Sequence, residues 1–349
     1  MTVEILVHSR HDLDFMPHDC RWVPNSTRFI VLGMTSKSTG KLNILEVRED
    51  GTSVVSDVDC PAGLKCCTFG AHTLPERLIA TGNFEGELEI RDLENATIPQ
   101  KTILAHNSTI NAIDGVGGGE NGVGAPEIVT GGRDGLVKVW DTRQDNNPVA
   151  ILGSNSLPTC ECWSVAFGNS FDNNERCVLA GYENGDVKLY DLRASDVAYE
   201  INVDNGVCSV EFDRKDILMN KFVVSCLESQ YVVFNGRRQH VDEGFASLTC
   251  TTETKTTLWG VRHLPQNRDM YAILLGDGTI ELYNYEYPSH QFTNDPKHQC
   301  RQIIGHVKRI GSHALASQPI NSFDWHRERR GLAVCTGLDQ SVHAVFTVF

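Results

Sequence analysis

The chain has 349 residues, and 31 Lys and Arg stand against 45 Asp and Glu, which gives a formal net charge of −14 at pH 7. This charge disfavours binding to nucleic acid or to anionic lipid, and no basic run reverses it locally. No apolar stretch is long enough to cross a bilayer and no signal peptide precedes the first strand, so we expect a cytoplasmic protein without membrane or nucleic-acid partners.

Short strands and tight turns alternate along the whole chain. Residues 131–143 (GGRDGLVKVWDTR) and 181–193 (GYENGDVKLYDLR) are near copies, and fainter copies recur. Seven turns end at Gly40, Gly86, Gly135, Gly185, Ser229, Gly278 and Gln340, which gives spacings of 46, 49, 50, 44, 49 and 62 residues. A period slightly above the roughly 40 to 45 residues of a WD40 unit predicts an all-β, seven-bladed WD40 β-propeller.

The two ends of the chain are predicted to complete the last blade together. The segment VEILVH, residues 3–8, resembles KTILAH at 101–106, which is predicted as the outer strand before the third turn. The chain stops at Phe349, after the third strand of the seventh repeat. We therefore expect the N-terminal strand, residues 2–8, to close the ring within one domain spanning 1–349.

A strand upstream of each turn ends in an aromatic residue in five of the seven repeats, and it is predicted to be the innermost strand of its blade. Aligning these strands places one set of residues near the entrance of the central channel: His18, Lys65, Asn111, Trp163, Cys208, Trp259 and Asn321. Trp163 and Trp259 flank Cys208 as a candidate anchor for a partner segment. The alternative is that both indole rings only pack beneath loops.

The third repeat contains most of the hydrogen-bonded side chains that WD repeats use. His106, Asp134 and Trp140 match the pattern, but Gly132 stands where a hydroxyl residue is expected. We therefore expect this network to be broken at Gly132, and the other blades to rely on packing.

Two arginines invite a second hypothesis. Arg143 and Arg193 end WDxR-type boxes on consecutive repeats. In WD-repeat substrate receptors such a box docks on the adaptor of a cullin-RING ubiquitin ligase, although the same arginine can simply satisfy the outer turn.

The sixth repeat is longer than the others. The stretch from about residue 285 to 318 contains polar residues, Pro and His, and it is predicted to hold an inserted loop. The outer strand of this blade is expected near Cys300 to Ile304.

We predict no enzyme, because no nucleophile elbow, zinc-binding helix motif or paired-carboxylate motif occurs. The glycine-rich stretch 115–119 is followed by a predicted strand, so it lacks the helix N-terminus of a phosphate cradle. The twelve cysteines contain no Cys-x-x-Cys pair. We therefore predict no catalytic, cofactor or metal residues, and expect mostly buried free thiols at Cys20, Cys66, Cys67, Cys162, Cys208, Cys226 and Cys335.

Several strings lie outside the repeat consensus: residues 124–131, 205–216, 219–221, 261–268 and 285–288. They resemble the Monad-type WD-repeat dynein axonemal assembly factors over essentially the whole chain. The resemblance implies a cytosolic adaptor, monomeric within a larger complex, that acts in the preassembly of axonemal dyneins. Its implied partners are axonemal dynein chains as clients and an R2TP and prefoldin-like co-chaperone with RuvB-like ATPases and an RNA polymerase II-associated TPR protein. The sequence departs from the family pattern at Gly132 and around residues 284–310.

Overall fold

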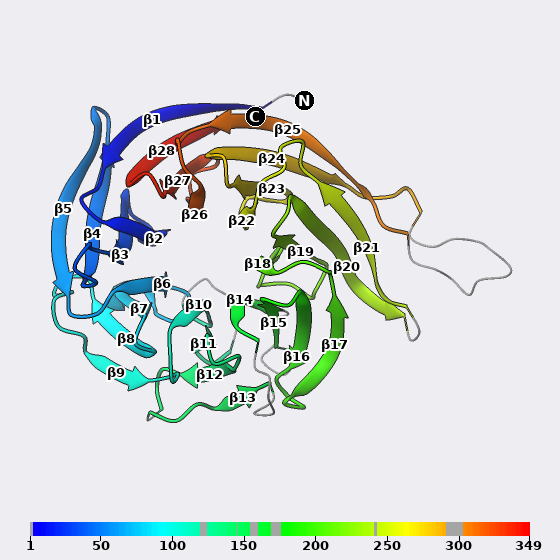
Figure 1. Cartoon of the computed structure of the whole chain (residues 1–349), viewed down its shortest axis with the longest axis horizontal. Coiled ribbons are helices and arrows are strands. Elements are labelled where there is room, and N and C mark those ends of the chain that lie inside the picture. The colour runs from blue at the N-terminus through cyan, green and yellow to red at the C-terminus, as the bar shows by residue number, and fades with distance from the viewer. Residues whose placement is uncertain are drawn as a thin grey trace, which may run out of the picture.

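The computed structural model describes residues 3–118, 124–144, 146–153, 160–168, 176–240, 243–290 and 303–349. These residues form seven four-stranded antiparallel sheets. Figure 1 shows the sheets arranged as blades in a ring, with β2, β6, β10, β14, β18, β22 and β26 innermost. The predicted seven-bladed propeller is confirmed.

The first six blades use consecutive strands, counted outwards from the channel. They are β2 (Met16–Trp22), β3 (Arg28–Met34), β4 (Gly40–Arg48) and β5 (Gly51–Cys60); then β6 (Leu64–Thr68), β7 (Leu78–Asn83), β8 (Glu87–Asp92) and β9 (Lys101–Leu104); then β10 (Ile110–Val116), β11 (Glu127–Gly132), β12 (Val137–Asp141) and β13 (Ala150–Leu152). The next three blades are β14 (Cys162–Gly168), β15 (Cys177–Tyr182), β16 (Asp186–Asp191) and β17 (Asp196–Asn202); β18 (Val207–Phe212), β19 (Lys221–Cys226), β20 (Gln230–His240) and β21 (Gly244–Thr251); and β22 (Leu258–Leu264), β23 (Asn267–Leu275), β24 (Thr279–Glu286) and β25 (His306–Ala314). A short 3-10 helix, η1 (Leu74–Glu76), precedes β7.

Burial explains the composition of the strands. The second strands lie between neighbouring blades on both faces, and β15 and β19 are buried at every position. Outer strands such as β17 face solvent and are exposed at most positions. A strand covered on both faces is stabilised by apolar side chains at every position. A strand covered on one face alternates apolar and polar residues.

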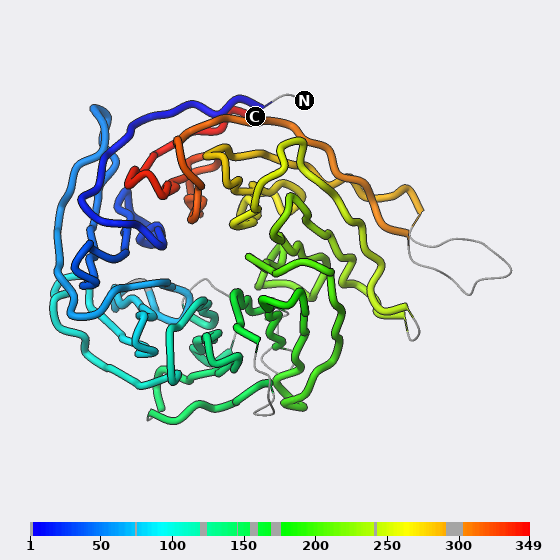
Figure 2. The backbone as a smooth tube through the Cα atoms, viewed as in Figure 1, coloured from blue at the N-terminus to red at the C-terminus, as the bar shows by residue number. Residues whose placement is uncertain are grey.

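The seventh blade contains β26 (Ile320–Trp325), β27 (Leu332–Gly337), β28 (Ser341–Val348) and, outermost, β1 (Glu4–Asp12). The β1 to β28 pairing runs from Glu4 opposite Val348 to Asp12 opposite Ser341, so the predicted closure is confirmed. Figure 2 shows the start of the chain running along the outside of its last strand. The strand continues to Asp12, beyond the predicted end at residue 8, because a bulge between Val7 and Ser9 restores its register with β28.

The outer strand of the sixth blade lies further along the chain than predicted. Strand β25 begins at His306, pairs with Glu286 there, and ends opposite Thr279. The expected position near Cys300 to Ile304 was wrong. A perimeter strand needs only a few inward side chains, such as Ile310, so its sequence marks its position weakly. Residues 291–302, which contain much of the predicted insertion, lie outside the described residues.

The core consists of apolar side chains packed between adjacent blades. Between the fourth and fifth blades, for example, the Phe222 and Phe234 rings stack with centroids 4.7 Å apart, and Phe212 meets Phe222 edge-on. The cysteines within the described ranges are free thiols. Of the seven predicted to be buried, six are buried and Cys208 is half-buried.

Candidate functional site at the channel entrance

The structure places the seven predicted ring residues at one equivalent position. Each is the residue skipped in the pairing of an innermost strand with its neighbour, which makes it the extra residue of a β-bulge. Trp163, for example, lies between the pairs Cys162 with Tyr182 and Ser164 with Gly181. The same shift occurs at His18, Lys65, Asn111, Cys208, Trp259 and Asn321. A bulge re-aims a side chain, so all seven are turned out of the regular pleat where the inner strands begin.

Two members of the ring have a structural role. Asn111 Nδ2 donates to the Cys162 carbonyl at 3.1 Å, and Asn321 Nδ2 donates to the Pro17 carbonyl at 2.7 Å. Both bonds reach the next blade and satisfy a carbonyl on the inner strand's unpaired edge. These asparagines therefore brace neighbouring blades.

Three other members lie on the consecutive blades four, five and six. Trp259 is 38% exposed, while Trp163 is half-buried and its Nε1 donates to Glu161 Oε2 at 3.3 Å. A Cβ on Gly206 would lie 2.9 Å from the Trp163 ring and 3.1 Å from Leu227, so the indole rests close against the backbone. Together with Cys208, the two tryptophans form a surface we call the Trp arc. Exposed aromatic surface of this kind suits an apolar anchor of a partner.

The remaining two members, His18 and Lys65, are half-buried. Burial, followed by the charge of Lys65, lowers the pKa of His18 to about 4, so the imidazole is neutral at physiological pH. Burial also lowers the pKa of Lys65. The His18 ring packs edge-on against Phe84, with ring centroids 5.2 Å apart.

The side-chain network in the third blade is continuous. His106 Nδ1 lies 2.8 Å from Asp134 Oδ1, and His106 Nε2 lies 2.8 Å from Thr130 Oγ1, which accepts the Trp140 Nε1 hydrogen at 2.9 Å. The predicted break at Gly132 was wrong, because the hydroxyl comes from Thr130, two residues earlier on the same face of β11. Gly132 makes room for this network, since a Cβ there would lie 2.2 Å from His106 Nδ1.

Arg143 and Arg193 are each held by the aspartate of their own box. Arg143 forms a two-pronged pair with Asp141, at 3.0 and 2.7 Å, and Arg193 Nη2 lies 3.2 Å from Asp191 Oδ2. The two arginine side chains are 63% and 72% exposed. The pairs satisfy the outer turns, and ligase docking stays a prediction.

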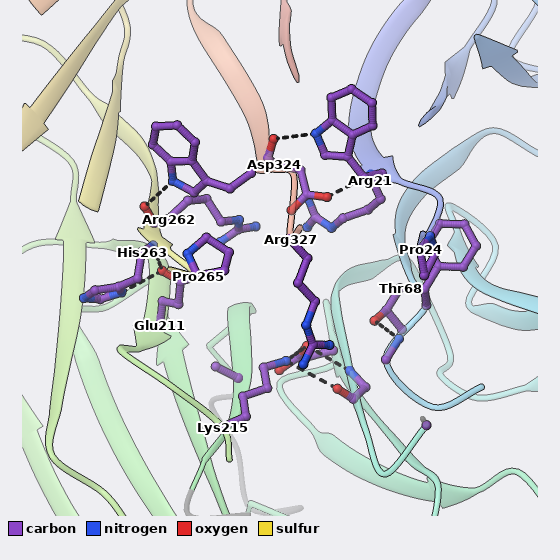
Figure 3. Close-up of a pocket in the computed structure, with 18 of the residues that line it drawn as sticks. Arg21, Pro24, Thr68, Glu211, Lys215, Arg262, His263, Pro265, Asp324 and Arg327 are labelled. Carbon is purple, nitrogen blue, oxygen red and sulfur yellow. Dashed lines mark hydrogen bonds and ion pairs between the residues drawn. The ribbon is translucent and has the colours of Figure 1, made fainter. Parts of the chain in front are cut away.

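The opposite end of the channel holds a cavity of about 460 Å³, shown in Figure 3. Three carboxylates there accept backbone N–H groups from the next blade: Asp114 from Phe167 at 2.8 Å, Glu211 from His263 at 2.6 Å, and Asp324 from Trp22 at 2.8 Å. They satisfy donors on the inner strand's free edge. Sequence reasoning missed them, although an acidic residue three positions after the ring residue in blades three, five and seven was the available signal.

Within the described ranges, no group of three or more His, Cys, Asp or Glu side chains could hold a metal ion. Among the same residues, no helix is long and apolar enough to span a membrane. Among the described residues, the feature of the channel best suited to binding is therefore the Trp arc at its entrance.

Comparison with known proteins decides the family. Residues 98–141 match the family described as WD domain, G-beta repeat. The chain is 46% identical over 340 residues to "Dynein axonemal assembly factor 10" of Chlamydomonas reinhardtii, covering 97% of this chain and 95% of the relative. The chain belongs to the dynein axonemal assembly factor 10 family.

Other members of the family show the same full-length similarity. The protein of that name in Homo sapiens is 43% identical over 346 residues, covering 98% of this chain and 96% of the relative. The Dictyostelium discoideum member is 26% identical over 365 residues, covering 95% and 91%. Because these alignments span all seven blades, the family resemblance drawn from the five strings is confirmed.

Proposed function

We propose that this chain is a non-enzymatic scaffold that acts as a co-chaperone adaptor in the cytoplasmic preassembly of axonemal dyneins. The observation that carries the proposal is the 46% identity, over nearly the full length, to a protein named for axonemal dynein assembly. The fold supports it, since a propeller presents rigid loops and strand ends to several partners at once.

We further propose that the partners are an R2TP-type co-chaperone, with RuvB-like ATPases and an RNA polymerase II-associated TPR protein, and axonemal dynein chains as clients. The Trp arc is the surface best suited to one of these contacts. It combines an exposed indole, a half-buried indole and a neutral thiol, because burial raises the pKa of Cys208 to about 12. Desolvation of such aromatic surface concentrates binding free energy in a few residues.

Affinity purification of the tagged chain from a ciliated cell tests this proposal. Dynein heavy chains together with RuvB-like ATPases should be recovered with the wild-type chain. Loss of the gene should remove dynein arms from the axoneme. Intact arms after gene loss would contradict the assembly function, whatever the partners recovered.

A second candidate is a substrate receptor of a cullin-RING ubiquitin ligase. The observation in its favour is that Arg143 and Arg193 expose their guanidinium groups at matching positions on consecutive blades. Changing both to Ala should abolish recovery of the ligase adaptor if the boxes dock there. Unchanged recovery from the double variant removes this candidate.

A further inference from the structure

One face of the propeller carries an unexpected concentration of arginine. The loops that follow the first and third strands of each blade open on the same face, because those strands run in the same direction. On blades five to seven, the strand ends and loops at 236–240, 265–269 and 326–331 contain six arginines against two carboxylates. The arginines are Arg237, Arg238, Arg268, Arg327, Arg329 and Arg330, and we call this surface the basic sector. It stands on a chain whose net charge is −14.

Three arginines of the basic sector differ in pairing from four arginines on other blades of this face. On blades one to four, Arg48, Arg77, Arg143 and Arg193 each form an ion pair with a carboxylate, at 2.8, 3.7, 2.7 and 3.2 Å. In the basic sector, the guanidinium groups of Arg268, Arg329 and Arg330 form no ion pair with a carboxylate in the described part of the chain. No carboxylate of the described residues neutralises these three charges, although the Arg330 guanidinium lies over the Phe349 ring, 4.7 Å from its centroid.

The loops of the basic sector form a continuous surface. Lys221 Nζ donates to the Arg268 carbonyl, which ties blade five to blade six. Gln266 Nε2 donates to the His326 carbonyl at 2.9 Å, which ties blade six to blade seven. Figure 3 shows Arg327 and Pro265 from these loops beside the channel cavity.

A buried polar cluster fixes these loops. Lys221 Nζ lies 3.1 Å from Asp213 Oδ2 and 3.6 Å from Asp269 Oδ1, and the Lys221 and Asp213 side chains are 2% and 1% exposed. Asn220 Nδ2 donates to Asp213 and, at 2.9 Å, to the Tyr287 hydroxyl. A buried ion pair contributes little net stability, but it holds its surroundings in one geometry. Four of the strings outside the repeat consensus, at 205–216, 219–221, 261–268 and 285–288, meet at or beside this cluster.

Two exposed apolar side chains belong to loops on the same face. Leu218 is 57% exposed and Tyr287 is 37% exposed. The Arg237 guanidinium lies over the Tyr287 ring, 5.0 Å from its centroid, and its Nε donates to Asn220 Oδ1 at 2.5 Å. The surface therefore offers apolar contact area next to oriented cations.

We propose that the basic sector binds an acidic segment of a partner protein that carries an apolar side chain against Leu218 and Tyr287. Charge complementarity selects this occupant, because carboxylates are attracted to unpaired guanidinium groups and repelled by the acidic remainder of the surface. Arginine pairs two-pronged with planar carboxylates, which gives the contact direction as well as strength. The inference stands apart from the proposed role in dynein assembly, since it concerns another face and follows from charge and geometry alone.

The test uses the full chain and a fluorescein-labelled peptide with a central Leu-Phe pair flanked by Glu and Asp. Fluorescence anisotropy should show binding that weakens as salt is raised. The double variant Arg268→Glu and Arg329→Glu should lower the affinity by roughly tenfold or more, since close charge pairs contribute on this order. The matched control, Arg48→Glu with Arg193→Glu, reverses two charges on the same face of other blades and should bind like wild type.

Three results would overturn the proposal: no binding of the acidic peptide, equal loss in the control variant, or tighter binding of phosphatidylserine vesicles or oligo-dT than of the peptide. If the double Glu variant melts early, Arg268→Gln with Arg329→Gln keeps the test open, because neutral side chains at half-exposed and exposed sites disturb the fold little. This variant should still weaken the peptide, and unchanged affinity would count against the basic sector.

Discussion

Thr130 holds together the polar network of the third blade, because its hydroxyl bonds both His106 and the Trp140 indole. Thr130→Val should lower the free energy of unfolding by about 1 to 3 kcal/mol, since two buried polar groups lose a partner. Thr81 provides the control: it occupies the same register position in the second blade and is also fully buried, and its hydroxyl has no partner among the described residues. Urea unfolding should therefore show a change below about 0.5 kcal/mol for Thr81→Val, and equal losses at both sites would refute the network's role.

Individual residues of the third-blade network differ in how well the sequence predicts them. Three of the four network members could be predicted, but the hydroxyl was sought at Gly132 because pattern matching cannot tell which of two residues on one strand face meets the imidazole. Geometry resolves this, since Gly132 lies against His106 and leaves no room for a side chain there. The inner-strand carboxylates Asp114, Glu211 and Asp324 were missed for a related reason: their partners are backbone groups of another blade.

The bulge position of the innermost strands has two roles: in some blades its side chain bonds the next blade, and in others it is exposed to a partner. Asn321→Ala should reduce stability by about 1 to 3 kcal/mol, because the buried carbonyl of Pro17 and the hydroxyl of Thr336 lose their partner. Trp259→Ala should leave the melting temperature nearly unchanged, since the residue is 38% exposed, and should weaken partner capture. Thermal denaturation and affinity recovery, measured on both variants, separate the two roles. A large loss of stability in Trp259→Ala would favour packing alone.

At the scale of elements, the repeat spacing was enough to align the inner strands, and all seven aligned positions proved to be bulge residues. The alignment succeeded for the inner strands because the same bulge occurs at the same position in every blade. The outer strand β25 was misplaced because perimeter strands are short of apolar residues, so their sequence carries little signal. The blade-five and blade-six strings were recognised, but their meeting around Lys221 depends on contacts between loops that are distant in sequence.

At the scale of the whole ring, the seam between the seventh and first blades includes a hydrogen bond in which Asp324 accepts the Trp22 N–H. Burial raises the pKa of Asp324 from 3.8 to about 6, although Arg21, this N–H and Arg262 oppose the shift. The folded state then binds the proton more tightly than the unfolded state. Stability from this group is fully present below pH 3.8 and is lost as the pH rises through about 6.

Asp324→Asn should remove this dependence while keeping an acceptor for the Trp22 N–H. The difference in unfolding free energy between the wild type and the variant should shift in favour of the variant between pH 3.8 and about 6, and stay constant above that interval. Urea titrations of both proteins at matched pH values measure it. Parallel pH profiles would show that Asp324 does not carry this proton at the seam.

The pairing of β1 with β28 has a consequence for protein synthesis. A ribosome makes β1 before every other strand and β28 after them, so β1 has no partner until nearly the whole chain has been translated. During that time its backbone edge and the apolar face around Ile5 stand open to other nascent chains. A premature stop codon anywhere before Ser341 would remove β28, which leaves β1 without its partner and exposes the edge of β27 as well.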